Sequence, residues 1–579
     1  MKKSLSIALS IMLLAAVFVS CGGDKEAKAE AEAPVTTTTT TEKVAETPEP
    51  ETTTEVKAQT PTQTTPEVAA TTTTPAEDEG VTFTLSNGAE PASLDPALIQ
   101  GVPEHRIYMA MFEGLVTVDP KTANAAPGLA ETWESNEDGT QYTFHLRHTT
   151  WSDGVPITAN DVVYSWLREL APETASPYAW FPTMFLKGAA EYNSGEADAS
   201  AVGIRALDDY TFQMDLIGPI PYAVDALQHY SFAVVPKHAI EEFGDKWTAP
   251  ENIVSNGPFL LKERVPQSYL SFVPNDKYWN KDDIHIDKLV ILSSDDENTN
   301  YNMFTNGEID WITNVPTDKL ASAKMKDSYQ ANAQLATYYY IFQTEVAPLD
   351  NVLVRKAISY AINREDLVEG VTKAGQIPAW GIVPPMAGYD ALEFPFDSEE
   401  EATEMAQEFL AEAGYPNGVG FPTLEVLYNT SEGHKQIAEY VQQELKTKLG
   451  IDIELVNEEW GTFLDDRASG AFEIARAGWV GDYQDPNTFL DMFMTGAAMN
   501  GGKYANDVYD TLLKEAATIE NPVDRLGVLK TAEDIIVNED CAIMPFYYYI
   551  TINMIDTNKW GGWYKNTMDY HPYTGLYLK

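Results

Sequence analysis

The sequence is poor in cysteine and in basic residues. Its 579 residues include only two cysteines, Cys21 and Cys541, so we expect no disulfide framework in the fold. Lys and Arg number 38 against 88 Asp and Glu, which gives a formal net charge of −50. Phosphate groups repel such an acidic chain, so neither nucleic acid nor an anionic lipid surface is expected as a partner.

The motifs of common enzyme and metal sites are also missing. The eight histidines are scattered, with no HExxH pattern and no Cys/His cluster, so we expect no metal site. There is no Walker loop, no GxGxxG after a strand and no GxSxG. Chance carboxylate pairs such as Glu458 and Glu459 leave a glycosidase-like site open but unsupported. Cys541 lies in an apolar stretch that predicts a buried, unreactive thiol. The sequence therefore predicts neither an enzyme nor a cofactor.

The N-terminus has the form of an export signal. Lys2 and Lys3 precede an apolar segment, residues 5–19, which is too short to span a bilayer comfortably. It ends at Phe18-Val19-Ser20-Cys21, which resembles the lipobox of bacterial lipoproteins, although Phe18 departs from the usual Leu. We expect a signal peptide at 1–20 and a lipid on Cys21, which places the protein outside the cytoplasm on a bacterial membrane. An ordinary cleaved signal followed by a chance cysteine is the alternative.

Residues 21–80 form a low-complexity segment rich in Thr, Glu, Ala and Pro. Residues 22–80 contain no aromatic residue and include runs such as Thr36 to Thr41. Such a composition cannot bury enough apolar surface to offset the entropy of ordering the chain. We expect a disordered leash between the anchor and the folded part.

The rest of the chain has ample material for a globular interior. Hydrophobic residues make up 44% of the sequence and aromatic residues 11%, with 12 Trp and 30 Tyr. A chain of this length usually forms several domains. Helical and alternating periodicities both occur, which indicates a mixed α/β fold. We expect strands at 142–146, 211–216 and 451–455, a helix that begins near Thr158, and helices at 351–371, 400–413 and 432–449.

Several motifs in the same order resemble one family over essentially all of 81–579. They are Leu94-Asp95-Pro96, Phe112-Glu-Gly-Leu115, Trp151-Ser-Asp-Gly154, Asp161 to Trp166, Thr174 to Tyr178, Asn256-Gly257, Gly307 to Asp310, Tyr338 to Tyr340, Glu459 to Arg467 and Ala475 to Tyr483. Together they resemble the oligopeptide-binding proteins of ABC peptide importers, the family 5 extracellular solute-binding proteins.

The resemblance implies an α/β clamshell with two lobes and an additional inserted domain. The first lobe is expected at 81–112, 237–335 and 551–579, the inserted domain at 113–236, and the second lobe at 336–550. Closure of the lobes around a ligand is a hinge motion. The implied function is capture of short peptides and their delivery to an ABC importer permease by a monomeric binding protein.

The resemblance also implies which residues touch the peptide. Asp482 is expected to pair with the α-ammonium group, because a buried ammonium needs an ionised partner. The cations that meet the C-terminus are expected to be Arg467, Arg476 and His434. The other expected contacts are Trp479, Tyr483, Trp460, Tyr178, Tyr339, Tyr549 and Val102. For these residues, a place in the core or an ordinary salt bridge is the alternative.

The sequence departs from the family pattern at three places. Thr372 stands where the family has a lysine that meets some short peptides, although Lys373 is adjacent. Gln100 replaces a common acidic residue, and Ala336 and Val480 occupy the positions of a disulfide. Peptide length is therefore left open. A narrow binder of a cell-wall muropeptide or a signalling peptide, and a surface hydrolase or adhesin on the same scaffold, remain alternatives.

Overall fold

The computed structural model describes residues 80–579 apart from 221, 387 and 520. The expected signal peptide, Cys21 and the leash up to residue 79 lie outside these residues, so the predictions about them stay predictions. Within the described range, no helix combines the length and apolarity that a membrane crossing requires.

One large mixed sheet runs through the structure. Its eleven strands occur in the spatial order β15 (Ile453–Glu458), β14 (Leu424–Asn429), β16 (Ile474–Val480), β12 (Tyr329–Phe342), β17 (Ile543–Ile555), β11 (Trp311–Ile312), β1 (Thr82–Ser86), β10 (Lys288–Leu292), β9 (Tyr269–Pro274) and β8 (Phe259–Val265), with β13 (Ile377–Pro378) paired to β17.

The two longest strands lie at the centre of this sheet and join its two halves. β12 has 14 residues and β17 has 13, and they pair antiparallel along most of their length. The pairing is interrupted between Ala333 and Thr337. On one side of the interruption β12 also pairs with β16, and on the other side β17 pairs with β11. A local break in the ladder makes this the part of the sheet that bends most easily.

A second, four-stranded antiparallel sheet lies within the expected inserted domain. Its order is β4 (Ala130–Ser135), β5 (Gln141–Leu146), β7 (Thr211–Asp215) and β6 (Ile204–Asp208). α2 (Ala159–Leu170) packs against it and starts with the capping box that the sequence predicts, formed by Thr158 and Asp161. Trp166 of this helix is fully buried, and its Nε1 donates a hydrogen bond to the Phe232 carbonyl at 3.1 Å.

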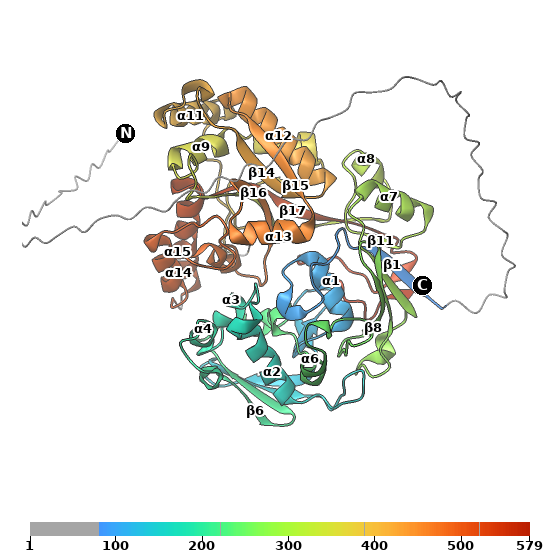
Figure 1. The fold of residues 1–579 in the computed structure, drawn as a ribbon. Coiled ribbons are helices and arrows are strands. Elements are labelled where there is room, and N and C mark those ends of the chain that lie inside the picture. The colour runs from blue at the N-terminus through green and yellow to red at the C-terminus, as the bar shows by residue number, and fades with distance from the viewer. Residues whose placement is uncertain (1–79, 221, 387, 520) are drawn as a thin grey trace, which may run out of the picture. The chain divides into compact units, whose positions relative to one another are not determined.

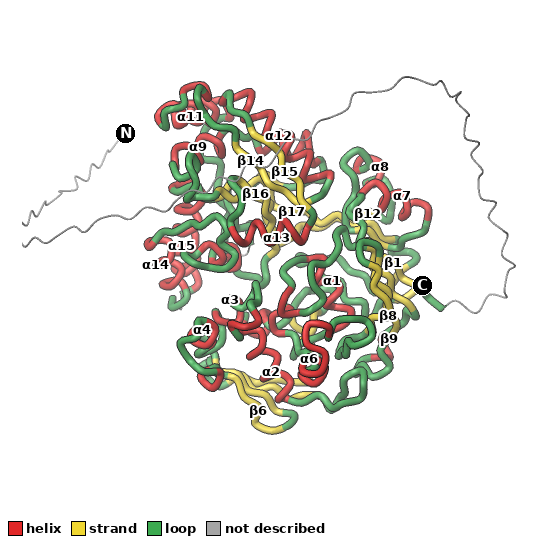
Figure 2. Tube along the Cα trace, viewed as in Figure 1, coloured by secondary structure: helices red, strands yellow, loops and turns green. Residues whose placement is uncertain are grey.

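The helices gather in two groups. Figure 1 shows α9, α11, α12, α14 and α15 around one half of the large sheet, and α1, α2 and α6 in the other part of the molecule. Figure 2 shows the strands running between the groups.

The helix bounds are α1 Val102–Met111, α3 Trp180–Thr183, α4 Ala189–Asn193, α5 Ala223–Ala226, α6 Lys237–Phe243, α7 Glu297–Asn306, α8 Leu320–Ala323, α9 Val352–Tyr360, α10 Arg364–Asp366, α11 Glu399–Glu412, α12 Glu432–Leu449, α13 Trp460–Ser469, α14 Asp507–Ala516 and α15 Pro522–Asp534. The short strand pairs are β2 (Val116–Val118) with β3 (Ala125–Pro127), and β18 (Trp560–Gly561) with β19 (Tyr577–Leu578).

One predicted helix is wrong in its extent. The helix expected at 351–371 ends at Tyr360 as α9, and a new turn, α10, begins after Asn363. The Asn363 side chain accepts a hydrogen bond from the Asp366 backbone N–H, which is an N-cap that favours a fresh start over continuation. The chain then continues as a π-helical segment, Leu367–Thr372. The strand expected at 451–455 is also displaced, since β15 runs from Ile453 to Glu458.

Candidate ligand-binding cavity

A cavity of about 390 Å³ lies between the segments expected to form the lobes. The loop after β1, the N-terminal end of α1 and the segment near Tyr570 line one side, and α12, α13 and β16 line the other. Its volume lies within the range of roughly 300–1,000 Å³ that is typical of small-ligand sites. All of the residues expected to touch a peptide line this cavity except Tyr339 and Tyr483: Asp482, Trp479, Arg476, Arg467, Trp460, His434, Tyr178, Tyr549 and Val102.

A buried carboxylate without a cationic partner marks one end of the cavity. Asp482 follows β16, and its backbone N–H donates to Thr488 Oγ1 at 3.0 Å, which fixes the turn. Its side chain is 7% exposed, and Oδ1 lies 3.5 Å from His229 Nε2. Burial, helped by the nearby His105, lowers the pKa of His229 far below its ordinary value, so this imidazole is neutral at pH 7. Asp482 Oδ2 is buried and has no hydrogen-bond partner among the described residues.

The electrostatics around Asp482 favour a cation from outside the protein. Burial, with a smaller contribution from Asp491, raises the pKa of Asp482 well above its ordinary value. A buried carboxyl group in this state is stabilised strongly when a positive charge comes to hydrogen-bond distance. The described residues supply no such charge to Asp482.

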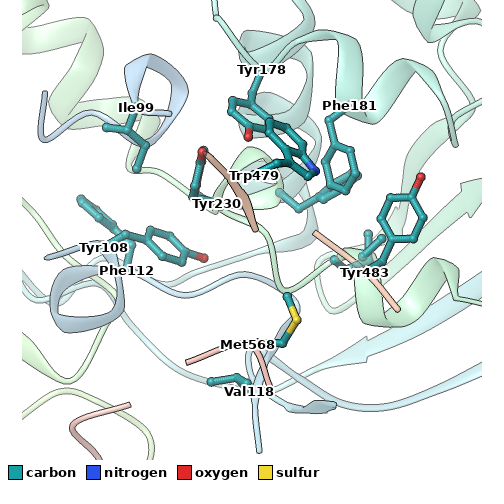
Figure 3. Close-up of a cluster of buried hydrophobic side chains, with 14 of the residues drawn as sticks. Ile99, Tyr108, Phe112, Val118, Tyr178, Phe181, Tyr230, Trp479, Tyr483 and Met568 are labelled. Atoms are coloured by element: carbon teal, nitrogen blue, oxygen red, sulfur yellow. The ribbon is translucent and has the colours of Figure 1, made fainter. Parts of the chain in front are cut away.

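Aromatic rings wall this end of the cavity. Tyr178 and Trp479 are stacked with 9° between their planes and 6.4 Å between their centroids, and the ring of Tyr178 lies 4.6 Å from that of His229. Figure 3 shows Tyr178 and Trp479 close together beside Phe181, with Tyr230 nearby. The rings exclude water from Asp482, and an electrostatic contact in such a site is stronger than in water.

Tyr483 lies behind this wall instead of lining it. Its hydroxyl donates to Asp491 Oδ2 at 2.8 Å, and its ring stacks on Tyr222 at 4.5 Å. Tyr339 is similarly placed in the interior, where it packs at 5.9 Å from Phe493. Both side chains are buried in the core next to the cavity.

Arginines lie in the part of the cavity that is lined by the segment expected to form the second lobe. Arg476, in β16, donates from Nη1 to Asn429 Oδ1 at 3.2 Å and from Nη2 to the Tyr549 hydroxyl at 3.0 Å. Arg467, in α13, places its guanidinium 5.6 Å from the Phe463 ring. Neither arginine forms an ion pair with a carboxylate of the described residues. Arg476 is buried and Arg467 is half-buried, and two guanidinium groups without carboxylate partners among the described residues can bind a carboxylate.

His434 is placed in the cavity but not as a cation. Its Nδ1 lies 3.4 Å from the Tyr338 hydroxyl. Burial, together with the nearby charge of Arg476, lowers the pKa of His434 far below its ordinary value. The imidazole is therefore neutral at pH 7 and acts through hydrogen bonding, not through charge.

Two contacts join opposite sides of the cavity. Trp460, in α13, donates from Nε1 to Glu104 Oε1 in α1 at 3.1 Å. A Cβ at Gly101 would lie 2.7 Å from the Trp460 ring, so the close approach of the two helices depends on this glycine. The Ser431 hydroxyl, at the start of α12, donates to Glu297 Oε1 in α7 at 3.1 Å. These contacts connect the two sides of the cavity.

Most of the positions that depart from the family pattern also lie at this site, although Ala336 is not among the residues that line the cavity. Thr372 and Gln100 line the cavity, and the Thr372 hydroxyl donates to Gln376 Oε1 at 2.9 Å. Lys373 is exposed and is not among the lining residues. Ala336 and Val480 are directly opposite each other in the pairing of β12 with β16.

Sequence reasoning missed His229, Tyr230, Tyr570 and Arg106, which also line the cavity. His229 lies more than 250 positions from Asp482 in the sequence, and no local pattern marks it. Only the fold brings the two side chains together.

The comparisons with known proteins decide the family. Residues 124–501 match the model of the bacterial extracellular solute-binding proteins, family 5, middle region. The chain belongs to this family. The periplasmic oligopeptide-binding protein OppA of Escherichia coli K12 is 37% identical over 510 residues, which cover 86% of this chain and 93% of OppA.

Solved structures of the family match the whole folded part and confirm the fold class, the α/β clamshell with two lobes and an additional domain. Haemophilus influenzae OppA in complex with the peptide RPPGFSPFR matches with a TM-score of 0.83 and 32% identity, over 86% of this chain and 99% of that one. The murein tripeptide binding protein MppA of E. coli also matches with a TM-score of 0.83, at 35% identity over 86% of this chain and 99% of MppA. The unliganded open form of MppA gives only 0.59, at 34% identity over 87% and 99% of the two chains. This family 5 protein therefore resembles MppA in a conformation other than the open one.

Proposed function

We propose that this family 5 protein captures short peptides between its two lobes by clamping their free α-amino group on Asp482, and that it delivers them to an ABC importer permease. The observation that carries the proposal is the buried Asp482 Oδ2, which lies in an aromatic-walled cavity and has no hydrogen-bond partner within the described part of the chain. A peptide α-ammonium supplies the missing charge and up to three donors. The relatives named for oligopeptides and a murein tripeptide support a peptide as the ligand.

The ends of the peptide have different partners in this proposal. Asp482 pairs with the ammonium. Arg476 and Arg467 donate hydrogen bonds to the terminal carboxylate, whose two oxygens match the planar fork of a guanidinium. Trp479, Tyr178, Trp460 and Tyr549 enclose the middle of the peptide, and Val102 borders it from the first lobe. His434 contributes a hydrogen bond. Tyr339 and Tyr483 support the cavity wall from behind.

The test of the proposal is the identity of the ligand that co-purifies with the protein. The native protein is unfolded in acid, and the released small molecules are analysed by mass spectrometry. We expect a mixture of peptides a few residues long with free amino termini. Release of a sugar, a metal chelate or no molecule at all, combined with no binding of added peptides, contradicts the proposal.

A narrower peptide range is a second candidate, because the MppA structure matches as well as the OppA structure does. A competition panel of unrelated tripeptides to pentapeptides and one murein tripeptide separates the two. Similar affinities across the panel support broad capture. A preference of more than about 100-fold for the murein tripeptide supports the narrow binder.

We also propose that the protein is tethered to a membrane through a lipid on Cys21, with residues 22–80 as the leash. The lipobox-like sequence at 18–21 and the composition of the leash support this. Cells grown with an alkyne-labelled fatty acid should label the wild-type protein, whereas Cys21→Ser should be unlabelled and released from the membrane. Labelling of the Cys21→Ser protein contradicts the anchor.

A further inference from the structure

The first-lobe side of the cavity contains a buried guanidinium that the amine clamp does not use. Arg106, in α1, lines the cavity and is only 8% exposed. Its Nη1 donates to the Asn87 backbone carbonyl at 3.2 Å, and this is its one hydrogen bond to the described residues. Its Nε is buried and has no hydrogen-bond partner in the part of the chain that the structure describes. Its face lies 5.9 Å from the centre of the Trp311 ring.

No carboxylate of the described residues neutralises Arg106. The charge of Asp569 raises the pKa of Arg106 against the effect of burial, but the two groups do not form an ion pair. Asp569 Oδ1 is occupied instead by Asn553 Nδ2 at 2.8 Å and by His571 Nε2 at 2.9 Å. Burial lowers the pKa of Arg106, although an arginine remains charged at pH 7. A charged group that is desolvated and left with unused donors destabilises the closed protein unless an anion binds there.

Arg106 contrasts with two other buried arginines, whose N–H groups donate hydrogen bonds to several protein acceptors. Arg364 is 1% exposed, yet it donates to the carbonyls of Ser359, Ile362 and Pro545 and to the Ser359 hydroxyl. Arg355 likewise donates to several carbonyls. Those two arginines stabilise the fold. Arg106 differs because it lines a cavity and donates only one hydrogen bond to the described residues.

We propose that Arg106 forms an anion-binding subsite in the first lobe that receives an acidic side chain of the bound peptide, so that the protein selects peptides with Asp or Glu at one position. The inference rests on the proposed peptide-binding function. It assigns the side-chain carboxylate to Arg106 because Arg467 and Arg476 already offer cations to the terminal carboxylate from the opposite side. A guanidinium donates two parallel hydrogen bonds to the two oxygens of a carboxylate, whereas the neutral amide of Gln has only one oxygen to accept them.

The test compares Glu with Gln, which have the same shape, at each position of a peptide. Alanine peptides of three to five residues are first titrated by calorimetry to find the length that binds most tightly. In that peptide each residue is replaced in turn by Glu and by Gln, and a C-terminal amide version of each is included. We expect a preference for Glu of about tenfold or more at one position, since a desolvated charge-assisted contact is involved. This preference should persist in the amide.

The matched variants are Arg106→Gln, Arg106→Lys and Arg264→Gln. Arg264 lies in the same lobe but pairs with Glu90 at 2.8 Å and does not line the cavity. In Arg106→Gln the Glu-to-Gln affinity ratio should fall to about one, and in Arg106→Lys it should be intermediate because the charge stays and the fork is lost. Arg264→Gln should keep the wild-type ratio. Thermal unfolding of each variant identifies any protein that is not folded, and Arg106→Lys then takes the place of Arg106→Gln.

Several results overturn the inference. The inference is wrong if Glu and Gln peptides bind equally at every position. It is also wrong if Arg106→Gln lowers the affinity for the Glu peptide and for the Gln peptide by the same factor. A Glu preference that disappears in the amide assigns Arg106 to the terminal carboxylate instead of a side chain. If no alanine peptide binds at all, the proposed function itself fails, which is a different outcome from binding without Glu preference.

Discussion

At the scale of the residue, the cavity is marked by buried charged groups that lack partners. Asp482 Oδ2 and Arg106 Nε are both buried and form no hydrogen bond with residues 80–579 as far as these are described, whereas most buried polar atoms in proteins are hydrogen-bonded. Arg476 is held by Asn429 and Tyr549. A site that fixes its charged groups and leaves some donors and acceptors open is prepared for a polar ligand.

Tyr483 tests the distinction between residues that line the cavity and residues that support it. Tyr483→Phe removes the hydroxyl that donates to Asp491 but keeps the ring that stacks on Tyr222. The free energy of unfolding should fall by about 1 kcal/mol, because Asp491 keeps its hydrogen bond from Asn487. Chemical denaturation measures this change. The peptide dissociation constant should change by less than about twofold, and a loss of about tenfold or more contradicts the supporting role.

The sequence could predict the residues of the cavity only in part. One motif covers β16 and the turn after it, and it contains Arg476, Trp479 and Asp482, which all line the cavity. Tyr339 and Tyr483 matched the same motifs, but the direction of a side chain depends on the strand and turn geometry. Arg106 and His229 could not be predicted from the sequence. Arg106 is notable because it lacks a carboxylate partner among the described residues, and His229 because it lies beside Asp482, which is distant in the chain.

At the scale of the element, the start of α12 meets α7 across the cavity. The Ser431 hydroxyl donates to Glu297 Oε1, and Asn298 Nδ2 donates to both Glu432 oxygens, at 2.9 and 2.7 Å. Burial raises the pKa of Glu297 to about 7, the Ser431 hydroxyl opposes this increase, and the nearby Glu432 and Asp296 add to it. Two like charges, Glu297 and Glu432, are thus brought together when the lobes close.

This contact predicts a pH dependence of closure. In an open form Glu297 is hydrated and its pKa returns toward 4.5, so closure takes up a proton between the two values. Closure is therefore favoured below pH 7 and loses this contribution as the pH rises through about 7. Between pH 6 and 8.5, the factor by which peptide affinity falls should be about ten times larger for the wild type than for Glu297→Gln. This variant keeps the oxygen that accepts the Ser431 hydrogen bond. The comparison cancels the titration of the peptide's own amine, and parallel pH profiles contradict the prediction.

Elements with strong local signals could be predicted well. α12 begins and ends where its N-cap Ser431 and its C-terminal Gly450 indicate. The interruption after α9 was missed because the apolar periodicity continues through Ile362, while the competing signal is the single side-chain cap of Asn363. Local capping chemistry therefore decided this boundary over periodicity.

At the scale of the whole molecule, β12 and β17 connect the two halves of the large sheet, and their pairing is interrupted in one short segment. One MppA structure matches this chain with a TM-score of 0.83 and the unliganded open form of MppA with only 0.59, which indicates an arrangement other than the open one. The boundaries at 335/336 and 550/551 lie beside this interruption, and the division into lobes stays a prediction. The resemblance supplied this architecture, because periodicity alone identified only a mixed α/β chain.

Closure around a peptide predicts linked changes in stability and size. At a peptide concentration of 100 times the dissociation constant, the free energy of unfolding should rise by about 2.7 kcal/mol. The radius of gyration from small-angle X-ray scattering should decrease at the same time. Stabilisation without compaction contradicts closure as the way in which the peptide is enclosed.

The measurement that tests the central claim most directly compares free and N-acetylated forms of one peptide on the wild type and on Asp482→Asn. Removal of one partner of a buried charge pair costs about 3–5 kcal/mol, so calorimetry should show that the variant loses about 100-fold or more in affinity for the free peptide. The acetylated peptide should bind the wild type weakly, and the variant should weaken it by only a few-fold. Equal losses for the two peptides would show that Asp482 does not hold the amine.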